Sequence, residues 1–170
     1  MDTGQAGAVL PGLFRELVDG SGTSPSPFML NSGDAGLLRS IDQLTAADAS
    51  RSVEGGATIA AHTEHLRLGL LLMNRWAAEG GNPFAVSTWD EAWNISAVDA
   101  PQWEDIRRGL REQCARWVQI LEAPRQFGAF ELNTMIGSIA HLAYHVGAIR
   151  QISKAARGPR GGTFSRILYD

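Results

Sequence analysis

The sequence lacks the features that mark several large classes of protein. Its single cysteine, Cys114, cannot form an internal disulfide, which fits the reducing cytoplasm as its location. The apolar stretch Leu68–Asn74 is too short to cross a bilayer, and the first residues, which include Asp2 and Glu16, do not resemble a signal peptide. The net charge is -3, from 15 basic and 18 acidic residues, without a basic run. We therefore expect no membrane and no nucleic-acid partner.

Two common enzyme motifs are also missing. There is no Gly-x-Ser-x-Gly sequence of the serine-hydrolase type, and the glycines of residues 158–162 end a predicted helix, whereas a phosphate-binding loop opens one. No segment shows the alternating pattern of a strand. The chain has 170 residues, of which 44% are apolar and 19% charged. These values are typical of one folded domain, which we expect over residues 1–170.

Apolar residues instead recur at helical spacing along most of the chain. We expect short helices over residues 9–18 and 32–44, a short turn of helix after Thr45, and long helices over residues 57–79, 100–121 and 130–156. Ser32 or Asp34, Thr58 and Asp99 are expected N-caps. The connection of residues 82–100 has little periodicity. This pattern predicts an all-α fold, an up-and-down four-helix bundle with long crossover loops and short additional helices.

The four histidines lie in only two of these segments. His141 and His145 are four residues apart in the last predicted helix, and His62 and His65 are three apart in the first long one. Residues at these spacings share a helix face, so the two pairs can converge if the helices face each other. Three imidazoles with an open fourth position are the pattern of a catalytic metal site.

Spacing alone also allows histidines that bind nothing. Both pairs, however, lie in strongly apolar segments, where burial of an imidazole without a partner is unfavourable. His62 and His65 cannot both be assumed to be ligands, since at ~100° per residue they lie about 60° short of a full turn apart. One of them can point into the cavity while the other faces a helix interface or solvent.

The segments Ile59–Leu66 and Gly137–Ile152, with tryptophans between them, resemble the DinB-like superfamily of metal-binding four-helix bundles, which includes YfiT-type proteins and thiol-dependent transferases. The resemblance covers roughly residues 37–156. It implies His65, His141 and His145 as metal ligands, with zinc or nickel as the ion, and His62 as an additional histidine. It also implies a homodimer and, in some members, a low-molecular-weight thiol such as mycothiol or bacillithiol as cofactor.

We therefore expect a metal-dependent enzyme in which an activated thiol or water attacks a small-molecule substrate, as in a thiol S-transferase or a hydrolase. The alternative is a non-enzymatic stress-response protein that binds metal or dimerises. Catalytic residues beyond the ligands are not assigned. Trp89, Asp90 and Trp93 could line the mouth of the site, although packing of the tryptophans and solvation of the acid are the simpler interpretations.

Four further side chains have ordinary structural interpretations. We expect Tyr144 to pack in a groove between helices and Arg150 to form an ion pair. Cys114 falls on an apolar stripe and should behave as a small hydrophobic residue. Glu64 is next to His65, but neighbours on a helix diverge, so we do not expect it to be a ligand.

Overall fold

The computed structural model describes residues 3–22, 27–82, 85, 89–124 and 128–159, and these residues form helices and connections without a strand. The prediction of an all-α fold is therefore confirmed. In chain order the elements are α1 (Thr3–Asp19), α2 (Gly36–Asp42), α3 (Ala46–Ala49), α4 (Ile59–Glu79), the 3-10 helix η1 (Trp89–Asn94), α5 (Ala100–Glu122), α6 (Ala129–Ile152) and the 3-10 helix η2 (Lys154–Ala156).

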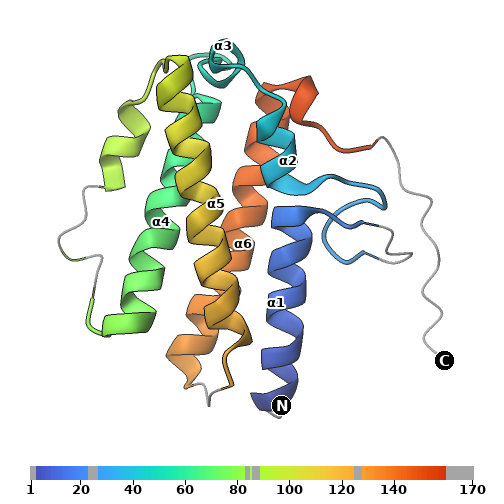
Figure 1. Cartoon of the computed structure of the whole chain (residues 1–170), viewed down its shortest axis with the longest axis vertical. Coiled ribbons are helices and arrows are strands. Elements are labelled where there is room, and N and C mark those ends of the chain that lie inside the picture. The colour runs from blue at the N-terminus through green and yellow to red at the C-terminus, as the bar shows by residue number, and fades with distance from the viewer. Residues whose placement is uncertain (1–2, 23–26, 83–84, 86–88, 125–127, 160–170) are drawn as a thin grey trace.

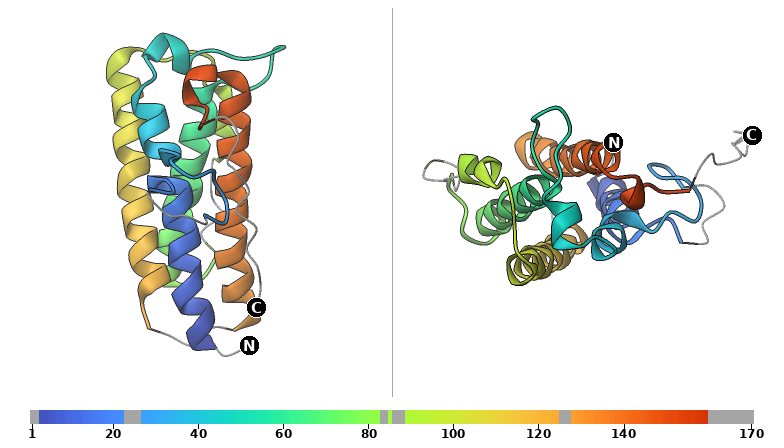
Figure 2. Two further views of the ribbon diagram at one scale, coloured as in Figure 1. Left: turned by 90° about the vertical axis from the view of Figure 1, so that its right-hand side faces the viewer. Right: turned by 90° about the horizontal axis from the view of Figure 1, so that it is seen from above.

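The four long helices lie side by side as a bundle, seen end-on in Figure 2. Helix α1 packs against α5 and α6, and α4 packs against the same two helices. Figure 1 shows α1 running upward, α4 and α5 downward, and α6 upward again. The hydrogen bonds agree, since Thr58 at the start of α4 bonds Ile95 just before α5, and Asn74 further along α4 bonds Gln113.

Strict up-and-down alternation therefore fails between α4 and α5, which are parallel. The reason is the connection between them, residues 80–99, which returns the chain to the end at which α4 began. Its η1 segment lies against α4. A long crossover was expected here, and its consequence for the site is that η1 can cover residues near the beginning of α4.

The predicted caps of the two central helices are present. Thr58 accepts a hydrogen bond from the backbone N–H of Ala61, and Gly80 ends α4 with a φ of 73°, a conformation that glycine adopts without strain. Asp99 forms a reciprocal capping box with Gln102 at the start of α5. The chain therefore fixes both ends of the helix that carries His62 and His65.

Three predicted boundaries are wrong. Helix α1 begins at Thr3 rather than at residue 9, because the six residues before Val9 are helical although their sequence lacks the apolar spacing of the rest. Helix α2 begins at Gly36, since the Asp34 carboxylate accepts the Gly36 N–H in a turn and leaves Ala35 as an N-cap without a side-chain bond. Helix α6 ends at Ile152 because Ser153 has an extended backbone and caps η2 instead.

The core runs the length of the bundle and receives side chains from every long helix. Because each helix turns apolar residues inward, burial of these residues stabilises the bundle. None of the described helices is long and apolar enough to cross a membrane. The largest fully buried side chains are Phe14, Leu17, Leu37, Ile41, Ile59, Leu110, Trp117, Leu121, Met135, Leu142, His145 and Ile149.

Candidate metal centre

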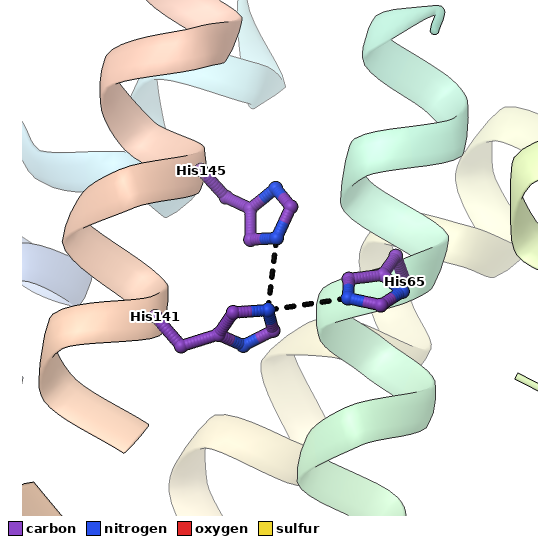
Figure 3. A group of neighbouring side chains, drawn as sticks. All are labelled: His65, His141 and His145. Atoms are coloured by element: carbon purple, nitrogen blue, oxygen red, sulfur yellow. Dashed lines mark hydrogen bonds between the residues drawn. The ribbon is translucent and has the colours of Figure 1, made fainter. Parts of the chain in front are cut away.

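Helices α4 and α6 are antiparallel neighbours, and they bring all four histidines together. Figure 3 shows His141 and His145 pointing from α6 toward His65 on α4. The spacing of four residues puts the two α6 side chains one turn apart on the same face. His145 and His65 are buried, with 2% and 5% of their surfaces exposed, and His141 is half-buried.

The three predicted ligands converge on one point through their ring nitrogens. His141 Nε2 lies 3.0 Å from His145 Nε2 and 3.2 Å from His65 Nε2. One nitrogen of each ring lies within 4.8 Å of the other two. Donor atoms ~2.05 Å from a tetrahedral zinc ion are separated by about 3.3 Å. Two edges of the triangle are therefore close to the spacing that such an ion requires.

Hydrogen bonding among the rings alone accounts poorly for this geometry. A neutral imidazole nitrogen carries one proton or one lone pair, directed in the ring plane. His141 Nε2 faces two other Nε2 atoms, so it can satisfy only one of them well. A cation between the rings would receive one lone pair from each of the three nitrogens. The donor set thus fits a first-row metal ion, and it leaves at least one coordination position without a protein ligand among the described residues.

The environment keeps these imidazoles neutral. Burial lowers the pKa of His145 to about 3 and that of His65 to about 4, and the charges of neighbouring histidines add to both effects. Burial also lowers the pKa of His62 and of His141. Since only neutral imidazole has a lone pair for a metal, the site has its binding form at neutral pH.

His62 contacts the site without joining the triangle. Its Nδ1 lies 2.9 Å from His145 Nδ1, on the side of the His145 ring away from His141. If His145 uses Nε2 as a ligand atom, its Nδ1 carries the proton and donates to His62. Metal-binding histidines commonly donate their second ring N–H in this way, which fixes tautomer and orientation. Of the α4 pair, His65 therefore points into the triangle, whereas His62 lies at the interface with α6 and contacts His145.

Trp93 of η1 covers the histidines on the crossover side. Its ring centroid lies 4.4 Å from that of His65 and 5.4 Å from that of His62, and 38% of the residue is exposed. It therefore shields the site from solvent while remaining at the surface. The side chain of Trp89 lies outside the described residues, and Asp90 is exposed, as expected of a solvated loop acid.

Tyr144 does not pack between helices, so that prediction is wrong. It is 69% exposed, because its position on α6 faces away from the bundle core. Its ring is perpendicular to that of His145, with 5.0 Å between the two ring centroids. Arg150 forms the expected ion pair, at 2.7 Å with the buried Asp34. Glu64 pairs with Arg67 instead of facing the histidines.

Cys114 is the buried hydrophobic residue that the sequence predicted, with 1% of its surface exposed. Burial raises the pKa of its thiol to about 12, and the charge of Asp19 adds to the rise. At neutral pH it is therefore a protonated thiol without nucleophilic character. The reactive group of the site, if the protein is an enzyme, does not come from this residue.

Fold and site together define an all-helical protein with a candidate three-histidine metal centre. No protein-family model, no curated protein and no solved structure matches the chain. Its function must therefore be inferred from the site itself.

Proposed function

We propose that this protein is a metal-dependent enzyme of the DinB-like type, with His65, His141 and His145 holding zinc or nickel. The observation that carries the proposal is the contact of His141 Nε2 with the Nε2 atoms of the other two rings. A first-row ion held there would lower the pKa of a thiol or water in its open coordination position and so supply a nucleophile at neutral pH.

The protein's own residues have three roles in this proposal. The three ligands stay neutral because they are buried. With His145 Nε2 turned to the metal, His62 Nδ1 accepts a hydrogen bond from the His145 Nδ1–H and holds that ring in its orientation. Trp93 restricts water on one side, which strengthens the electrostatic effect of any charge inside the site.

Metal analysis of protein purified without a histidine tag tests the first part. We expect about one transition-metal ion per chain, lost in His65→Ala, His141→Ala and His145→Ala with helical circular dichroism largely retained. The decisive control is His62→Ala, which should keep the ion at saturating metal. If His62→Ala loses the ion and His65→Ala keeps it, the ligand assignment is wrong.

Thiol transfer tests the second part. Metal-loaded protein should accelerate the reaction of a small thiol with 1-chloro-2,4-dinitrobenzene, and the metal-free protein and His145→Ala should not. Hydrolysis of activated esters, measured in parallel without thiol, distinguishes water from thiol as the nucleophile. A bound ion with neither activity, and with no spectral response to thiols, would support the alternative of a non-enzymatic metal-binding stress protein.

The homodimer is a separate proposal, and we assign it to the outer face of α6. Between Leu132 and Ile149 this helix has no Asp, Glu, Lys or Arg, and Ile136 on its outer side is 49% exposed. A helix that is apolar all round is normally covered, and a second copy of the chain would cover it. Light scattering should show a dimer that Ile136→Glu weakens while metal content is unchanged. A wild-type monomer would refute the dimer.

A further inference from the structure

A groove between α4 and α6 begins at the metal centre. It has a volume of about 190 Å³ and shares His141 with the triangle of histidines. It extends from His141 toward the end of α4 and the beginning of α6, away from His145. Its remaining wall consists of Leu66, Gly69, Leu70 and Met73 from α4 and of Thr134, Gly137, Ser138 and Leu142 from α6.

The wall of this groove offers almost no polar contact. It contains no charged side chain. The Thr134 hydroxyl donates to the carbonyl of Phe130. The Ser138 hydroxyl donates to the carbonyl of Met135 and accepts from the Trp117 indole. Both hydroxyl protons are thus already used within the protein, so acceptor groups of a ligand, such as carboxylates, would lose their bonds to water without replacement by these side chains. Among the side chains of this wall, His141 alone has a ring N–H or lone pair to offer beyond these hydroxyl oxygens, and it lies at the metal end.

Two glycines, one on each helix, keep the groove open. A Cβ atom placed on Gly69 or on Gly137 would meet no atom within 4 Å. Neither position has a positive φ, so the helix does not require glycine there, and glycine weakens a helix interior relative to alanine. An apolar space of about 150 Å³ is enough to hold a benzene ring. The groove therefore has room for a small hydrocarbon group.

We propose that this groove binds the hydrocarbon part of the substrate, an alkyl chain or an unsubstituted aromatic ring, while the reacting end lies at the three histidines. The inference rests on the proposed metal-dependent function and specifies its substrate class. It also places the polar body of a thiol cofactor elsewhere, because its carboxylates would find no charged partner and no free hydroxyl donor along this wall.

Binding of simple thiols to cobalt-loaded protein tests the proposal without any activity assay. The probes are ethanethiol, propanethiol, butanethiol and phenylmethanethiol, with 2-mercaptoethanol as the polar control, and the readout is the thiolate-to-cobalt charge-transfer band. We expect affinity to rise about fourfold per added methylene. Butanethiol and phenylmethanethiol should bind much more tightly than 2-mercaptoethanol.

Gly137→Leu should fill the groove and remove this dependence on chain length while ethanethiol still binds. Gly147→Leu is the matched control, since Gly147 is also an α6 glycine with open space around it but lies outside the groove. It should retain the wild-type series. The wild-type series decides the matter even if a variant fails to fold.

The outcomes separate the two levels of inference. Absence of a charge-transfer band with every thiol would overturn the open metal centre and the groove proposal together. Bands of equal affinity across the series would overturn the groove alone and leave the metal centre standing. Equal loss of chain-length dependence in Gly147→Leu and Gly137→Leu would also overturn the groove, because the effect would not be local to it.

Discussion

The hydrogen bond between His62 and His145 leads to the sharpest quantitative prediction. In His62→Leu the buried His145 Nδ1–H loses its acceptor, and with 2% of His145 exposed, water does not replace it easily. A buried donor left without a partner costs about 1–3 kcal/mol. Loss of a supporting group behind a metal ligand typically weakens metal binding about 10–100-fold, which is about 1.4–2.8 kcal/mol. The free energy lost with the hydrogen bond and the free energy lost in metal binding thus cover nearly the same range for His62→Leu.

The matched variant is His62→Asn. The asparagine carbonyl oxygen can lie near the position of the imidazole Nδ1 and accept the same proton. We therefore expect His62→Asn to bind metal within a few-fold of wild type, while His62→Leu binds about 10–100-fold more weakly. Competition with a chromophoric chelator measures both, at one ion per chain.

Three results would refute this reasoning. Complete loss of stoichiometric binding in both variants would make His62 a ligand, and the site would then have four imidazoles. Unchanged affinity in His62→Leu would show that the bond between the two rings does not orient His145. Equal weakening in His62→Leu and His62→Asn would attribute the effect to packing near Trp93.

Three further predictions concern buried groups that can carry a charge. Burial lowers the pKa of His65 to about 4 and that of His145 to about 3, so below pH ~6.5 the unfolded chain binds protons that the folded chain does not. The metal-free protein should therefore lose stability between pH 6.5 and 4, by at most ~1.4 kcal/mol per pH unit and histidine. A free energy of unfolding in urea that stays constant over this pH range would contradict the prediction. Arg150→Ala leaves Asp34 buried without a counter-charge and should lower the free energy of unfolding by about 3 kcal/mol, whereas removal of both charges should cost less. Cys114 should react with a thiol reagent only as fast as the protein unfolds, and rapid labelling of the native state would refute its burial.

The sequence predicts the parts of this fold that depend on local spacing. The caps at Thr58 and Asp99 and the shared face of His141 and His145 each follow from a few neighbouring residues. The beginning of α2 and the end of α6 do not, because Asp34 just before α2 pairs with Arg150 near the end of α6, which is 116 positions away. The parallel direction of α4 and α5 also cannot be predicted from local patterns, since a connection of 20 residues is long enough to reach either end of the bundle.

The site shows the same division between local and long-range information. Helical spacing places His62 and His65 on adjoining faces, but it cannot say which histidine of α6 each of them meets. That choice depends on the register between two antiparallel helices, which puts His65 opposite His141 and His62 opposite His145. A slip of one turn would exchange the partners, because it would bring His65 opposite His145 or His62 opposite His141, and it would leave one histidine of each helix without its ring partner. The four histidines therefore constrain the packing of α4 on α6 even without an ion, and an ion that binds only the folded register would stabilise it further.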